Sequence, residues 1–205
     1  MRRILFLISS CILVSWMTAC KSAADDVEAN STTSDAVATF SEDSTDYIWD
    51  VSKVIDVQFN TSSASGTGDG LAISGTAITI SKSGTYRFTG TLAGGQILVN
   101  TTDSGVVRLL LNGVTMTNSS SAPVYIKKAG RAVINVVEGT ANSLSDASKY
   151  VYSGSATEPD APIFSNVNLA IFGGGTLTLK GNYADGISSD DGLLIKSSTI
   201  SVTAV

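Results

Sequence analysis

Short runs in which apolar and polar residues alternate follow one another along most of the chain, separated by Gly, Asn and Ser. Alternation with a period of two is typical of β-strands that bury one face. No stretch shows the 3.6-residue spacing of an amphipathic helix, so we expect helices no longer than a turn or two. The predicted strands cover residues 77–81, 85–89, 96–100, 106–111, 114–117, 124–127, 132–137, 169–172, 176–180, 193–196 and 199–203.

An internal repeat relates the last groups of strands to each other. The sequence from Ile163 aligns with the sequence from Ile187 at a constant step of 24 residues, and one extra glycine in the run 173–175 then shifts the register. Weaker copies begin at Val124 and Ile97. The aligned pairs are Ile163–Ile187, Ser165–Ser189, Asn166–Asp190, Leu169–Leu193, Ile171–Ile195, Leu177–Ile200 and Leu179–Val202.

A repeat of two or three short strands with no helix between them is typical of one turn of a β-solenoid, whose turns pair in parallel around a continuous core. Sandwiches and barrels also have regularly spaced strands, but antiparallel hairpins do not require apolar positions to recur at one fixed step. We therefore predict an all-β fold with a parallel β-helix over residues 71–205 and a cap over residues 47–70. Because the chain stops directly after a strand, we expect further turns in the natural protein, or a truncated chain.

The first nineteen residues have the layout of a secretory signal, with Arg2 and Arg3 before an apolar run that is too short to span a bilayer. Met-Thr-Ala-Cys, ending at Cys20, resembles a bacterial lipobox, so we predict lipidation of Cys20 and a place at the cell surface or outer envelope. The alternative is ordinary cleavage after Ala19, which leaves Cys20 as an unpaired thiol. Residues 20–46 are small, polar and acidic, which predicts a disordered tether.

The charge and the absence of histidine exclude several functions. Removing residues 1–19 changes the net charge from −5 to −7, because 11 Lys and Arg remain against 18 Asp and Glu. Such a chain is a poor ligand for nucleic acids or anionic membranes, so membrane contact is expected only through the lipid anchor. With no histidine, a Ser-His-Asp triad and His-ligated zinc are excluded. Any metal site would consist of oxygen ligands.

From about Thr79 onward the sequence resembles a bacterial family of exported carbohydrate-binding β-helix proteins. The resemblance implies a right-handed parallel β-helix related in shape to pectate lyases, bound calcium, and binding of acidic plant polysaccharide or cellulose without established catalysis. The family pattern has an acidic pair in both of the last two turns, whereas this chain has Asn166-Val167 in the earlier one. The motifs are SGTYRFTGTLAGGQILV, VVRLLLNGVTMTNSSSAPVYIK, VINVVEGTANSLSDASKYVY and DAPIFSNVNLAIFGGGTLTLKGNYADGISSDDGLLIKSSTISVTA.

Three carboxylates crowd together near the C-terminal end. Equivalent residues on successive parallel turns lie about 4.8 Å apart, so acids there repel one another unless a cation lies between them. Ca²⁺ takes six to eight oxygen ligands, and we predict a calcium site at this place. The alternative is that these aspartates form turns and face water. The predicted ligands are Asp185, Asp190, Asp191, Asn166 and Asn182.

Three further side chains are candidates for contact with sugar. The insert over residues 142–159 interrupts the repeat and carries Tyr150 and Tyr152, whose rings would either stack on sugars or pack onto the adjacent turn. Lys196 would add a positive contact to a uronate held through calcium. Its alternative role is that of a solvated lysine at a strand edge.

Three functions are compatible with these features. The leading hypothesis is a monomeric, surface-anchored protein that binds polysaccharide with the help of calcium and does not cleave it. The second is a calcium-dependent polysaccharide lyase in which Lys196 or Lys180 acts as the base. The third is a structural adhesin of the cell envelope that has no sugar ligand.

Overall fold

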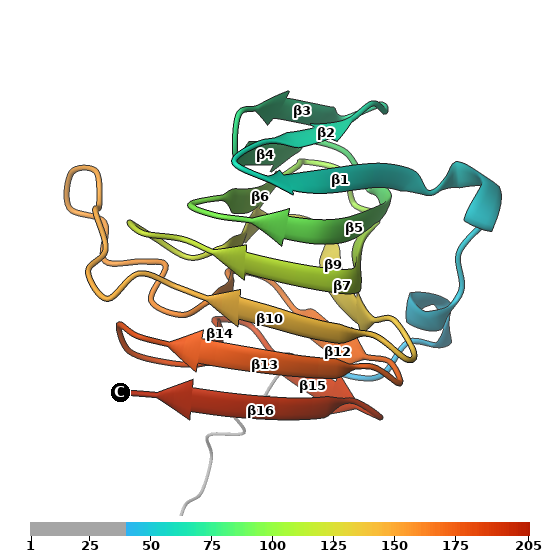
Figure 1. Cartoon of the computed structure of the whole chain (residues 1–205). Helices are drawn as coiled ribbons and strands as arrows, with labels where there is room; N and C mark the ends of the chain where they lie inside the picture. The colour runs from blue at the N-terminus through green and yellow to red at the C-terminus, as the bar shows by residue number, and fades with distance from the viewer. Residues whose placement is uncertain (1–39) are drawn as a thin grey trace, which may run out of the picture. The chain divides into compact units, whose positions relative to one another are not determined.

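The computed structural model describes residues 40–205, and these residues form an all-β unit with no α-helix (Figure 1). Two short 3₁₀ helices, η1 (Ser44–Tyr47) and η2 (Val51–Lys53), precede the strands. The strands are β1 (Ile55–Thr61), β2 (Ala64–Gly66), β3 (Leu71–Ser74), β4 (Ala77–Ile80), β5 (Gly84–Leu92), β6 (Gln96–Asn100), β7 (Val106–Thr117), β8 (Val124–Lys128), β9 (Arg131–Val136), β10 (Ala141–Ser145), β11 (Ile163–Ser165), β12 (Leu169–Phe172), β13 (Thr176–Gly181), β14 (Ile187–Ser189), β15 (Leu193–Lys196) and β16 (Thr199–Ala204).

The strands form two sheets in which nearly all pairs are parallel. Sheet A runs β15-β12-β9-β7-β10-β13-β16, with β5 beside β7, β1 beside β5 and β2 beside β1, and sheet B runs β14-β11-β8-β6-β4-β3. Within the described residues, only β1–β2 and β3–β4 pair antiparallel. The runs 106–111 and 114–117 are one strand, β7, and its two halves pair with β9 and β10 respectively. Two rows of strands therefore continue from β7, one through β9 and one through β10.

The register of the last strands confirms the repeat that the sequence predicts. Ile163 pairs with Ile187 in β11–β14, and Leu169 pairs with Leu193 in β12–β15. After the extra glycine the step changes, and Leu177 pairs with Ile200 in β13–β16. All three pairs of strands are parallel, as stacked repeats require.

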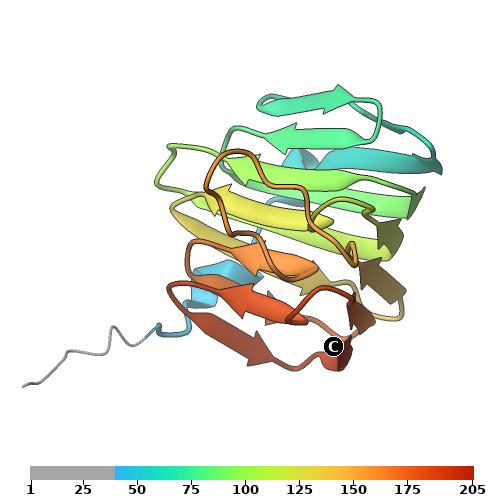
Figure 2. The same cartoon turned by 90° about the vertical axis from the view of Figure 1, so that its left-hand side faces the viewer.

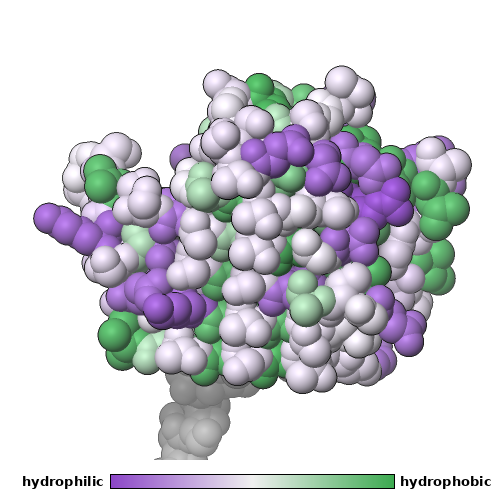
Figure 3. Space-filling model, in the orientation of Figure 1, coloured by the Kyte–Doolittle hydropathy of each residue, from purple (hydrophilic) through white to green (hydrophobic). Residues whose placement is uncertain are grey.

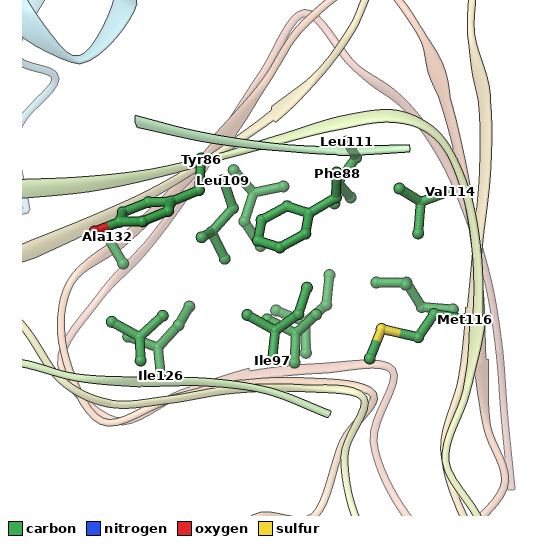
Figure 4. Close-up of a cluster of buried hydrophobic side chains, with 14 of the residues drawn as sticks. Tyr86, Phe88, Ile97, Leu109, Leu111, Val114, Met116, Ile126 and Ala132 are labelled. Carbon is green, nitrogen blue, oxygen red and sulfur yellow. The ribbon is translucent and has the colours of Figure 1, made fainter. Parts of the chain in front are cut away.

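The core consists of apolar side chains that lie between the two sheets and repeat in register from strand to strand (Figure 4). One such row contains Tyr86, Leu109, Ile134 and Ile171, which are fully buried and pair in sequence from β5 to β12. The row ends at Ile195, which is 46% exposed because β15 is an edge strand. Burial of each Leu or Ile stabilises the fold by about 1.5–3 kcal/mol.

A segment that we call the N-terminal strap, residues 40–54, packs against the outer face of sheet A at the right of Figure 1. Asp46 is fully buried and pairs with Arg131 of β9, and the ring of Tyr47 meets that of Phe172 at 4.5 Å. Residues 40–46, the end of the predicted tether, thus make long-range contacts although they have no periodic pattern. Residues 47–54, the start of the predicted cap, lie along a face of sheet A.

The remaining predicted segments fall partly within the described residues. Strands β1 and β2, within the predicted cap 47–70, lie at the N-terminal end of sheet A. The predicted signal peptide, most of the tether and Cys20 lie outside the described residues. Among residues 40–205, no helix is long and apolar enough to cross a membrane.

Candidate functional site

Two of the predicted calcium ligands come together as the repeat requires. The side-chain amide of Asn166, which follows β11, donates to the Asp190 carboxylate at 2.7 Å, one repeat later. The same amide nitrogen donates to Glu158 at 3.2 Å. Asn166 therefore lies between two carboxylates and lowers their mutual repulsion.

The other predicted ligands lie apart from this pair. Asn182 faces Asp146, with its backbone N–H donating to one carboxylate oxygen at 2.6 Å and its side-chain amide donating to the Asp146 carbonyl at 2.8 Å. Asp146 is only 4% exposed, so it needs these donors. Asp191 is exposed, and no side-chain hydrogen bond to it is found in residues 40–205. In this part of the chain no three His, Cys, Asp or Glu side chains are grouped to hold a metal ion, so the five residues do not share one site.

A different set of carboxylates gathers around the end of the long loop between β10 and β11. Burial raises the pKa of Asp160, and the neighbouring carboxylates of Asp185 and Glu158 raise it further. One carboxylate oxygen of Asp160, Oδ1, is buried and has no hydrogen-bond partner among the described residues. Sequence reasoning missed Glu158 and Asp160, because the loop that carries them has no repeat partner.

Three tyrosines pack together beside these carboxylates, and we call them the tyrosine cluster. Tyr150 stacks on Tyr183 with ring centroids 4.6 Å apart, and Tyr152 lies 5.9 Å from Tyr150. Tyr150 is 6% exposed and its hydroxyl donates to Asp146 at 2.8 Å. Of the two roles considered for Tyr150, stacking on sugar and packing onto the adjacent turn, its burial favours packing. Tyr183, which the sequence analysis did not select, is 41% exposed.

The long loop itself is fixed to the preceding repeat. Figure 2, in which the loop faces the viewer, shows it in front of the sheets. The backbone N–H of Val151 donates to the Ser120 carbonyl at 2.8 Å, and the Tyr152 hydroxyl donates to the Pro159 carbonyl at 2.9 Å. The tyrosine cluster is therefore part of the packed structure, and only its outer rim is open to a ligand.

The structure places Lys196 in contact with the N-terminal strap. Its ammonium pairs with Glu42 and lies 5.2 Å from the centre of the Tyr47 ring. Its side chain is 49% exposed. The predicted role as a contact to a uronate would require this ion pair to open. Lys180, the other predicted base, is exposed on β13.

Comparison with known proteins adds to this geometry. A family model for carbohydrate-binding domain-containing proteins matches residues 74–205. The chain belongs to this family. A carbohydrate-binding domain-containing protein from Acetivibrio thermocellus is 39% identical over 137 residues, which are 66% of this chain and 48% of that relative. The chain thus spans about half the length of this relative.

A solved structure supports the same relationship. It is the structure of a polysaccharide lyase-like protein from C. thermocellum, determined as a gadolinium derivative. The similarity has a TM-score of 0.71 at 36% identity, and it covers 73% of this chain and 61% of the other. The match to the family model begins at residue 74, so the N-terminal strap, β1 and β2 lie outside it.

Proposed function

We propose that this protein is exported, anchored through a lipid on Cys20, and binds polysaccharide at the bacterial surface without cleaving it. Family membership supports a carbohydrate partner. The leader and the acidic tether support export. We further propose that the strands wind as a right-handed parallel β-helix, which the parallel pairing in both sheets supports.

The observation that carries the proposal is an exposed aromatic ring held rigidly beside carboxylates. Tyr183 is 41% exposed and is stacked on the buried Tyr150, so it presents a fixed face with little loss of conformational entropy. The C–H face of a pyranose can bury apolar area against such a ring. Asp160 and Asp185, close by, would contact the polar edge of the same sugar through a cation or through hydrogen bonds.

Calcium remains part of this proposal with a changed ligand set. The fit of a cation is supported by the buried Oδ1 of Asp160, which has no partner among the described residues, and by the burial and the neighbouring carboxylates that together raise the pKa of Asp160. Asp160 is the one carboxylate that we assign to the ion, because no three acidic side chains of residues 40–205 are grouped to hold a metal. When bound, calcium would neutralise Asp160 and offer its remaining coordination positions to sugar oxygens.

The lyase alternative is raised by the resemblance to a polysaccharide lyase-like protein. A lysine base needs to be free and desolvated beside the proton that it removes. Lys196 is instead bound to Glu42, and Lys180 is exposed. The geometry therefore favours binding over cleavage.

Affinity electrophoresis tests the proposal. Gels that contain polygalacturonate, hydroxyethylcellulose or xylan should retard the protein on at least one glycan, and Tyr183→Ala should abolish retardation on polygalacturonate. Val151→Ala is the matched control, because Val151 is a 74% exposed apolar residue of the same loop that belongs to no aromatic stack. Unchanged mobility on every gel would favour the adhesin, and release of an ultraviolet-absorbing unsaturated product from polygalacturonate would favour the lyase.

A further inference from the structure

Two adjoining clefts lie on the outer surface of sheet A, away from the tyrosine cluster. Their volumes are about 440 and 230 Å³, and they share Arg87 and Asn112 in their walls. We call them together the sheet A groove. Its floor is formed by β1, β5, β7 and β9, and its sides by the strap residue Trp49 and by β2. Each cleft approaches or lies within the range of a small-molecule site, roughly 300–1,000 Å³.

The floor follows from the register of the strands. Asp56, Arg87, Leu110 and Asn135 pair in sequence from β1 to β9, so the parallel ladder sets them side by side on the outer face. Figure 3 shows hydrophilic side chains gathered over β1 and β5. The strap and the long β10–β11 loop lie on opposite sides of the molecule (Figures 1 and 2), so the groove is separate from the tyrosine cluster.

Asn135 has an unusual position in this groove. Its side chain lines the smaller cleft and the residue is only 8% exposed. No hydrogen bond from or to its side-chain amide is found within residues 40–205, and its polar atoms are not among the fully buried unpartnered ones there, so the amide is open to the cleft. An amide that is nine-tenths buried and open to a cleft is matched by a ligand that both donates and accepts hydrogen bonds.

The charges of the groove determine the class of ligand. Asp56 accepts two hydrogen bonds from Arg87, at 2.5 and 2.8 Å. Among residues 40–205, Arg87 is the one cationic residue that lines the groove, and this ion pair neutralises its charge. Arg87 also lowers the pKa of Asp56, so both groups stay ionised and the pair leaves no net positive charge to attract an anion. The remaining polar groups are amides and hydroxyls, for example Gln58, Asn112 and Thr89. Such a set matches hydroxyl groups, and it does not match phosphates or uronates.

We propose that the sheet A groove is a second glycan-binding site, which takes a neutral pyranose chain, with Asn135 bonding sugar hydroxyls and Trp49 forming one wall. The inference shares the proposed affinity for polysaccharide, but it uses neither Tyr183 nor the carboxylates around Asp160. It also includes residues before position 74, which lie outside the family match. The two sites can therefore fail separately.

The test uses the full chain and soluble cellohexaose or xylohexaose, titrated by calorimetry in EDTA. The wild-type protein should bind one of these oligosaccharides. Asn135→Leu should weaken that binding about tenfold or more, since it removes at least one hydrogen bond. Its melting temperature should stay close to that of the wild type, because the substitution conserves volume and breaks no hydrogen bond between residues 40–205.

Two controls keep the outcomes separate. Asn60→Ala changes an exposed residue of β1 that does not line the groove, and it should bind like the wild type. Tyr183→Ala should still bind the neutral oligosaccharide but should no longer bind polygalacturonate. Absence of binding to both neutral oligosaccharides overturns the second site. Normal binding by Asn135→Leu also overturns it. A lower melting temperature of Asn135→Leu overturns it as well, because the amide would then have a structural role. Full affinity of a Trp49→Ala variant would exclude Trp49 as a wall of the site.

Discussion

Asp46→Asn should destabilise the protein strongly, although its sequence context is that of a tether. Asp46 is fully buried, and its carboxylate accepts hydrogen bonds from two nitrogens of Arg131, whose side chain is 17% exposed. Removal of one partner of a buried ion pair costs about 3–5 kcal/mol, because the other charge is left without compensation. Arg131 retains some solvent and a 3.3 Å hydrogen bond to the Ser41 carbonyl, so we expect about 3 kcal/mol.

This loss corresponds to a fall in the melting temperature of roughly 6–12 °C for a protein of this size. The assay is thermal unfolding, followed by circular dichroism and by the fluorescence of Trp49 in a Trp16→Phe background, since the chain has only these two tryptophans. If the strap detaches before the sheets unfold, Trp49 emission should shift to longer wavelength below the main transition.

Asp69→Asn is the matched control. Asp69 forms an ion pair with Lys82 at 2.7 Å, but both side chains are more than half exposed, and exposed pairs contribute about 0–1 kcal/mol. A melting temperature within about 1 °C of the wild type for Asp46→Asn, together with unchanged Trp49 emission, would show that the strap does not stabilise the fold.

Three further predictions concern other parts of the chain. Gly173→Ala should lower the melting temperature more than Gly113→Ala, because both glycines have positive φ but only at Gly173 would a Cβ lie 2.1 Å from the Val136 carbonyl oxygen. The raised pKa of Asp160 means that the folded state holds this proton more tightly than the unfolded state does. The free energy of unfolding of the wild type therefore falls as the pH rises from 3.8 through the raised value. In EDTA, Asp160→Asn should melt at a higher temperature than the wild type, by a margin that grows over this pH range. Calcium should stabilise the wild type and not this variant in melting curves, and an equal gain in both would refute the ligand set. Cys20→Ser should release the protein from membranes in cell fractionation, and continued dependence on detergent would contradict the anchor.

The sequence was sufficient to predict strands and register wherever apolar residues recur at the repeat step. Leu169 and Leu193, for example, pair as predicted because both must bury the same face. Strands β11 and β14 were not predicted, because three residues are too few to show alternation. Alternation of apolar and polar residues indicates a strand only when it extends over several consecutive residues.

The site was less predictable, because its residues are placed by single contacts between distant parts of the chain. Asn182 turns toward Asp146, 36 residues earlier, which no local pattern indicates. Tyr183 and Tyr150 stack across a loop whose course has no counterpart in the other repeats. The repeat did predict that Asn166 and Asp190 meet, because that contact follows the ladder.

The course of the N-terminal strap has a consequence for folding. In stacked repeats each unit contacts only its neighbours, so such proteins can unravel gradually from either end. The strap joins Glu42 to Lys196, 154 residues later, and passes Arg131 on the way to Trp49 beside Arg87. It can dock only after the late strands exist, and once docked it makes loss of an end strand costly. Unfolding, which would otherwise proceed gradually from the ends, should therefore be closer to a single cooperative transition.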